Sequence, residues 1–531
     1  MYAVLHRLNR PVIAVVAVTL IAGGLRLYHL SVPSERIFDE HFYSKDGCMY
    51  AGYSPPECGI HGETEKYWVG VWGESSWEHP QLGKWAIALG VMAFGNTPFG
   101  WRFPAAVAGT AAVALTAVLA QLLFRKPLWT FVAGLLLAVE GLEFVQSRTA
   151  MLDIFLTFWI LLAFVFLLLD RRWIERRTGP APPAPSAASP PSGPEPDRVD
   201  VPEPVSADVA SGFLAPVSSD LGSVVPAPTA PEPVPPEPAR ATATAVVESE
   251  SPNVPSPIFR PWRLATGVAF GCAVATKWSG VDAILAAGLI SIIWERTRRK
   301  ERMRRPLWRA IQQESFGIVL LLVLVPIAVY VVAYARFWVQ NGFDVSHFWN
   351  LQESMASFHF HLQGIDPKTH QPIHPYLSPA WKWILIGRPV VYYFTGPGRE
   401  VTDLGNPAIF WGSLIALPYV AIQWWRRRDW VAGFVIVAGL GQYLPWFLVS
   451  RPQFFFYVLP IVPFFVLALT YMARDLATVH LAGSRARPYL PVAVAFVVAA
   501  VAAFVFFYPV LSALPLSQKA WEARQWFGSW I

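Results

Sequence analysis

The chain has 531 residues, of which 54% are hydrophobic and only 15% are charged. Soluble domains carry roughly 25% charged residues, so this composition excludes an ordinary soluble protein and a chain that is disordered throughout. The net charge is +6, and the three cysteines are too few to staple a small secreted scaffold.

Long apolar segments recur along the chain and predict an all-α polytopic membrane protein. A transmembrane helix needs about 20 mostly apolar residues, and eleven segments meet this requirement, although two of them are short. Residues 82–95 are too few to span comfortably, which favours an interfacial or re-entrant helix. The predicted spans are 11–30, 101–124, 128–145, 150–169, 264–279, 281–294, 315–334, 405–423, 430–449, 454–472 and 489–510.

The distribution of Lys and Arg predicts a multi-pass cell-membrane protein with a cytoplasmic N-terminus and an extracytoplasmic C-terminus. In this orientation the cytoplasmic segments hold 24 basic and seven acidic residues, when 180–257 are left out. The rest of the chain holds 16 basic and 19 acidic residues. The first span resembles a secretory signal, but no clean cleavage site follows it, so we interpret it as retained. Two long loops, 31–100 and 335–404, then lie outside.

Residues 180–257 differ in composition from the rest of the chain. They hold 21 of the 48 prolines, no tryptophan, ten acidic residues and two basic ones. Such a tract cannot bury enough apolar surface to fold, so we predict a disordered cytoplasmic linker over 178–259. It joins an N-terminal membrane module, 1–177, to a C-terminal one, 260–531. We favour a simple tether, and binding of a partner is the alternative.

The first outer loop begins with adjacent carboxylates, Asp39 and Glu40. Such a pair suits general acid–base chemistry, with one carboxylate as the base and the other orienting a substrate. A solvated pair and a set of oxygen ligands for a divalent metal are the alternatives. Cys48 and Cys58 lie in the same loop, where an oxidising compartment permits a disulfide that the sequence leaves open.

Cationic side chains recur near the outer ends of the spans. Several cations at one membrane face suit a phosphate, because the planar fork of Arg matches phosphate geometry. Snorkelling to lipid headgroups is the alternative. Asp153 and Asp282 lie just within apolar spans, where pairing with a cation would offset their burial. The cations nominated for a lipid phosphate are Arg102, Arg148, Lys277 and Arg451.

The second outer loop carries His359 and His361, whose spacing places them on one face of a predicted strand. Zinc would need further ligands, and no spacing signature supplies them, so we predict no metal site. His374 and Tyr376 follow in the same loop. The sequence contains neither a nucleotide phosphate-binding loop nor an aromatic-interleaved basic tract, which argues against nucleotide-driven transport and nucleic-acid binding.

As a set, the motifs resemble those of the polyprenyl-phosphate-mannose–protein mannosyltransferases, a branch of the GT-C membrane glycosyltransferases. The resemblance covers nearly all of the chain except 178–259, and the order and spacing of the motifs are more specific than any one of them. The matching segments are 38–42, 79–84, Arg148 with 151–153, 276–280, 374–376 with Ser378, 405–407 and 451–460.

The resemblance implies a GT-C fold with about eleven spans and inverting transfer of mannose from a polyprenyl-phosphate donor to Ser/Thr hydroxyls of exported proteins. We expect no cofactor, because the ligand spacing does not support a divalent metal. It implies that Asp39 is the catalytic base and that Glu40 positions acceptor or donor. The family's essential arginine best matches Arg102, with Arg148 as a rival. The residues predicted to bind substrate are His79, Lys84, Arg102, Arg148, Asp153, Lys277, Trp278, His359, His374, Tyr376 and Arg451.

Two departures from the family pattern narrow the expectation. Residues 79–81 read His-Pro-Gln in place of His-Pro-Pro, and loop 335–404 is too short for the β-trefoil domain of eukaryotic members. The chain therefore resembles the bacterial, actinobacterial-type branch. Expected partners are the lipid donor, exported polypeptides, the bilayer and the secretion machinery.

Three alternative functions stay open from the sequence. One is a related transferase that moves the sugar to a lipid or glycan. A second is a multi-span transporter, although no internal repeat is visible. The third is a scaffold that acts through its proline-rich tract.

Overall fold

The computed structural model describes residues 10–61, 74–178, 259–299, 306–366, 368–396, 398–479 and 488–531. The linker predicted at 178–259 therefore lies almost wholly outside the described residues. Within the described ranges the chain is mostly helical, and seven helical segments are long and apolar enough to cross a membrane. The all-α membrane fold is thus confirmed. Three shorter apolar helices, 11–27, 82–94 and 127–138, accompany them.

The first half of the chain packs helices that are neighbours in sequence. Helices α6 and α7 each begin with a Pro. This residue is favoured at the first helical position, because the N–H that Pro lacks would have no intrahelical acceptor there. The predicted span 128–145 is wrong as one helix, because Glu140 accepts a hydrogen bond from Glu143 N and caps a new helix. The helices are α2 (Arg10–Leu27), α6 (Pro98–Phe124), α7 (Pro127–Ala138), α8 (Gly141–Gln146) and α9 (Leu152–Thr178).

The second half adds further apolar helices around this group. The long helix that begins at Pro306 passes through a π-helical turn and ends at Ala333. The segments are α10 (Pro261–Val274), α11 (Gly280–Arg299), α12 (Pro306–Val319), η2 (Leu320–Leu324), α13 (Val325–Ala333), α17 (Pro407–Arg427), α18 (Trp430–Tyr443), η3 (Leu444–Phe447), η4 (Phe455–Ile461), α19 (Val462–Thr478) and α20 (Leu490–Leu511).

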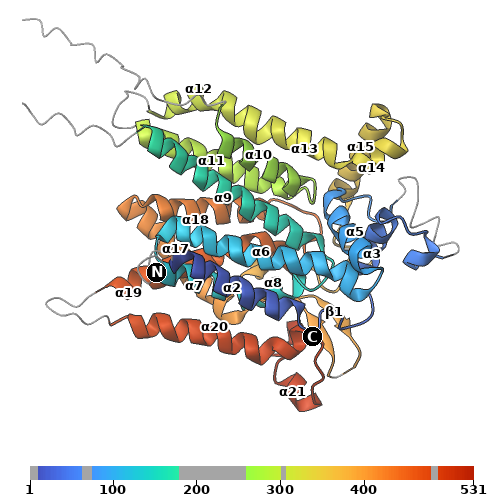
Figure 1. The fold of residues 1–531 in the computed structure, drawn as a ribbon. Coiled ribbons are helices and arrows are strands. Elements are labelled where there is room, and N and C mark those ends of the chain that lie inside the picture. The colour runs from blue at the N-terminus through green and yellow to red at the C-terminus, as the bar shows by residue number, and fades with distance from the viewer. Residues whose placement is uncertain are drawn as a thin grey trace, which may run out of the picture. The chain divides into compact units, whose positions relative to one another are not determined.

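The predicted outer loops gather at one end of these helices, where Figure 1 shows α3, α5, α14, α15 and β1. The helix predicted at 82–95 is present as α5. The strand β1 pairs antiparallel with β2 in a small hairpin. The elements are α3 (Glu40–Tyr50), η1 (Pro56–Cys58), α5 (Leu82–Phe94), α14 (Ala335–Gln340), α15 (Val345–His361), α16 (Ala380–Trp383), β1 (Val391–Phe394), β2 (Glu400–Thr402), α21 (Gln518–Glu522) and η5 (Gly528–Trp530).

The strand predicted around His359 and His361 is wrong, because both residues lie in the last turn of α15. Asp344 caps the start of this helix by accepting a hydrogen bond from His347 N at 3.0 Å. Residues two apart in a helix point in different directions, so the two imidazoles do not share a face. His361 is exposed and bonds within its own turn, to Ser357 O at 2.8 Å.

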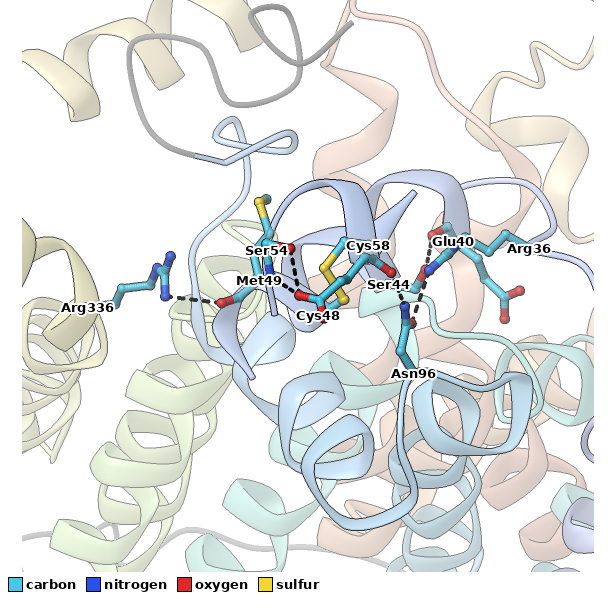
Figure 2. Close-up of a disulfide and its surroundings, with 10 residues drawn as sticks. Arg36, Glu40, Ser44, Cys48, Met49, Ser54, Cys58, Asn96 and Arg336 are labelled. Carbon is cyan, nitrogen blue, oxygen red and sulfur yellow. Dashed lines mark hydrogen bonds between the residues drawn. A yellow bond between two sulfur atoms is a disulfide. The ribbon is translucent and has the colours of Figure 1, made fainter. Parts of the chain in front are cut away.

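A disulfide joins Cys48 at the end of α3 to Cys58, which settles the pairing that the sequence left open (Figure 2). Figure 2 also shows Arg336, from α14, reaching the carbonyl of Met49 beside this disulfide, with an Nη1–O distance of 3.5 Å. The same guanidinium lies 4.7 Å from the ring of Tyr50. The first and second outer loops are therefore in direct contact.

Candidate active site

Asp39 lies at the N-cap position of α3, but its side chain makes no capping hydrogen bond. The preceding residue, Phe38, has a φ of 47°, in a region that a bulky residue rarely occupies. Its ring stacks on Tyr392 of β1, with 4.5 Å between ring centroids. The strained turn and this stack fix where α3 starts. The Asp39 carboxylate is consequently left for a role other than capping the helix.

Glu40 is fully buried and is bound by Arg102 through both carboxylate oxygens, each at 2.8 Å. The backbone N–H of Ala150 donates to one of these oxygens, at 2.9 Å. Arg102 also donates to the carbonyls of Pro33 and Glu35, at 2.6 and 2.8 Å. The polar groups of both side chains are thus hydrogen-bonded within the protein. These bonds hold the turn at Asp39, and contact of Glu40 and Arg102 with substrate stays a prediction.

Two further cations that were predicted to bind substrate, Arg148 and Lys84, also have partners within the protein. Arg148 donates to the carbonyls of Arg26, Tyr28 and His29, at 2.9, 2.5 and 2.9 Å. Lys84 is fully buried, and its ammonium lies 2.9 Å from the Glu74 carboxylate. In this structure the partners of these two cations are protein groups, and binding of substrate by them stays a prediction. Lys84 joins two parts of the first outer loop, and Arg148 joins the turn before α9 to the end of α2.

Lys277 and Asp153 form the pair that the sequence predicted for a carboxylate inside an apolar span. The Lys277 ammonium lies 2.8 and 2.9 Å from the two Asp153 oxygens. It also lies 4.4 Å from the centre of the Tyr457 ring, in cation–π contact. The pair joins α9 to the turn between α10 and α11. Lys277 keeps one side toward an adjacent cavity.

This cavity has a volume of about 360 Å³ and carries five of the predicted substrate-binding residues. Lys277 and Arg451 are its two cations. Trp278, Trp446 and Tyr457 give it the aromatic surface that sugar rings favour. The remaining lining residues are His79, Ser279, Asp282, His359, Phe360, Pro445, Leu448, Val449 and Ser450.

The Asp39 carboxyl is electrostatically linked to this cavity. Burial raises its pKa to about 7, Lys277 opposes the rise, and the charges of Asp153 and Glu78 add to it. A hydrogen bond from Tyr43 also favours the carboxylate. A carboxylate with a pKa near neutrality is the kind of group that can accept a proton during catalysis. Sequence reasoning missed Glu78, although it directly precedes His79.

His374 and Tyr376 lie apart from the cavity lining. The His374 ring packs against Phe454 at 5.2 Å between centroids, and Arg388 covers Tyr376 at 5.1 Å. The structure therefore does not bring these two predicted residues to the site. Sequence reasoning also missed Trp446 and Tyr457. Tyr457 falls inside segment 451–460, which matches the family pattern, so that match could have identified Tyr457 as a candidate site residue.

This helical membrane bundle, in which a carboxyl is linked electrostatically to a cavity with two cations, has the fold of the GT-C membrane glycosyltransferases. The solved S. cerevisiae protein O-mannosyltransferase Pmt1-Pmt2 complex bound to the sugar donor has this fold, with a TM-score of 0.67 and 14% identity. The match covers 98% of this chain and 93% of that chain.

Sequence comparison identifies the family. The dolichyl-phosphate-mannose-protein mannosyltransferase family matches residues 16–177 and 252–341, and the C-terminal four-transmembrane region of protein O-mannosyltransferases matches 344–530. The chain belongs to the protein O-mannosyltransferase family.

Bacterial relatives agree with this assignment. A polyprenol-phosphate-mannose–protein mannosyltransferase of Mycobacterium tuberculosis is 30% identical, over 85% of this chain and 80% of the relative. One from Mycolicibacterium smegmatis is 28% identical over 97% of this chain and 92% of the relative.

Proposed function

We propose that this glycosyltransferase moves mannose from polyprenyl-phosphate mannose to Ser/Thr hydroxyls of exported polypeptides. The family assignment and the names of the bacterial relatives support the reaction. The observation that carries it is the position of Asp39, a carboxyl with a pKa near 7 linked through Lys277 to the cavity. That electrostatic link supports a site in which Asp39 is the base and the cavity cations bind the phosphate.

The proposed chemistry is a single displacement. Asp39 takes the proton of the acceptor hydroxyl while the hydroxyl oxygen forms a bond to the anomeric carbon of mannose. The bond from that carbon to the phosphate oxygen breaks, and polyprenyl phosphate leaves with the bonding electrons. Lys277 and Arg451 stabilise the charge that develops on the phosphate. Attack from the opposite side inverts the anomeric centre, so a β-linked donor yields an α-linked product.

We also propose that the site faces the extracytoplasmic side and that the N-terminus is cytoplasmic. The loops predicted to be outside, 31–100 and 335–404, both contribute to this one site, as do Lys277 and Arg451. That agreement supports the same side of the membrane for both loops. Association with the secretion machinery follows from exported acceptors and would be tested by co-purification.

The proposed function is tested with the purified protein, labelled polyprenyl-phosphate mannose, and Ser/Thr-containing peptides or lipid acceptors. Labelled peptide is expected from the wild type, and Asp39→Asn should reduce its formation about 10²- to 10⁴-fold, since the base is lost. The matched control is Glu35→Gln, an exposed carboxylate in the same loop, which should keep full activity. Labelled lipid without labelled peptide would refute protein mannosylation.

A further inference from the structure

His359 is the point where α15 of the second outer loop meets the rest of the site. One of its ring nitrogens, Nε2, lies 2.9 Å from the carbonyl oxygen of Glu78, in the first outer loop. The other, Nδ1, lies 2.9 Å from Nη1 of Arg451. The ring also contacts Trp278 and His79, with centroids 5.5 and 5.7 Å away. Both nitrogens therefore have protein partners.

The partners of His359 define its protonation. A guanidinium can only donate, so Nδ1 must accept the hydrogen bond from Arg451. Nε2 then carries the hydrogen and donates it to the Glu78 carbonyl. Burial and the positive charge of Arg451 lower the pKa of His359 to about 4, so the ring is neutral at physiological pH. A neutral imidazole with both nitrogens engaged is suited to orienting Arg451 rather than to transferring protons.

Arg451 keeps unused hydrogen-bonding capacity beside the cavity. Its Nη2 lies 3.5 Å from the Tyr457 hydroxyl, which is a long contact. Its Nε is buried and has no hydrogen-bond partner among the described residues. The Nε and Nη2 edge of a guanidinium matches two oxygens of a phosphate. A buried donor without a partner is costly, and because Arg451 lines the cavity, a ligand bound there can supply the missing acceptor.

We propose that His359 is a positioning residue that holds Arg451 with its free edge toward the phosphate of the lipid donor. This inference rests on the proposed function, because it takes the donor phosphate as the anion in the cavity. Since His359 belongs to α15, donor binding then depends on the docking of the second outer loop onto the first.

The test measures equilibrium binding of sugar-free polyprenyl phosphate to the full-length protein. His359→Leu should weaken binding about tenfold or more, because Arg451 loses a hydrogen bond that fixes it. His359→Asn should stay within about threefold of the wild type, since its Oδ1 reaches the Nδ1 position and accepts from Arg451. His359→Gln, whose amide reaches the Nε2 position, should bind as weakly as His359→Leu. The control is His361→Asn, two residues away on the exposed side of α15.

Thermal unfolding of each variant shows whether it folds. If the Leu variant does not fold, the affinities of the Asn and Gln variants test the proposal. Equal affinities for the wild type and the Leu or Gln variant would overturn the proposal. So would an Asn variant as weak as the Gln variant, or a wild type that does not bind polyprenyl phosphate. Because binding requires no turnover, a failure of peptide mannosylation alone refutes the proposed function and leaves this result readable.

Discussion

The two ends of α9 bury charge in contrasting ways. Asp153 lies in the first turn, and Asp170 follows 17 residues later, roughly 25 Å along the helix axis. At the far end Arg260 pairs with Asp170 at 2.5 Å and with Glu314 at 2.9 Å, and Arg263 reaches Glu314 at 2.6 Å. All four side chains are buried.

The near end leaves its charges only partly matched. Lys277 binds Asp153 but also lines a cavity, and Arg451 holds a buried donor without a partner among the described residues. Buried charges are stabilised when they are paired, and cations that also line a cavity are available to a charged ligand. From this comparison we propose that the Asp170 end serves the fold and that the Asp153 end serves the reaction.

Lys277→Met should lower turnover about 10²- to 10³-fold, because a cation facing the leaving phosphate is lost. The substitution also leaves Asp153 without its cation, so the unfolding temperature should fall. The double variant Asp153→Asn with Lys277→Met removes both charges and should recover stability without recovering turnover. Turnover that recovers together with stability would show that the pair is only structural. Rates at saturating donor measure the turnover, and thermal unfolding measures the stability.

At the other end of α9, Asp170→Asn should destabilise the protein by about 3–5 kcal/mol, because Arg260 loses a buried partner. Turnover per folded molecule should stay unchanged, since this end is remote from the cavity. Chemical unfolding and the rate of the remaining folded protein check the two parts. A selective loss of turnover would break the division between the two ends.

Replacing residues 182–255 with a short flexible spacer should change turnover less than twofold. The reason is that Asp170 on α9 and Arg260 beside α10 already join the helices on either side of this stretch directly. The measurement is peptide mannosylation by the shortened chain in membranes, with its expression level as the control. Loss of activity at normal expression would give the tract a function of its own.

The sequence was sufficient to predict the helical membrane fold, because long apolar runs and basic clusters are local signals. It also predicted that a cation would pair with Asp153, without naming Lys277, and it singled out five residues that line the cavity. It could not separate the cations that bond mainly within the protein from those that line the cavity. The partners of Arg102 and Arg148 are largely backbone carbonyls from distant segments, which a single sequence does not reveal. The strand at His359 failed because a short stretch of alternating aromatic and histidine residues fits two periodicities.

The pH dependence of kcat/KM, compared between the wild type and Glu78→Gln, tests the role of Asp39 most directly. A base must be deprotonated, and the pKa of Asp39 is about 7, so the wild-type rate should rise tenfold per pH unit below 7 and level off above it. The charge of Glu78 raises that pKa, so Glu78→Gln should move the inflection to lower pH. A rate that is flat from pH 5 to 9, or an inflection that Glu78→Gln leaves in place, would contradict the account.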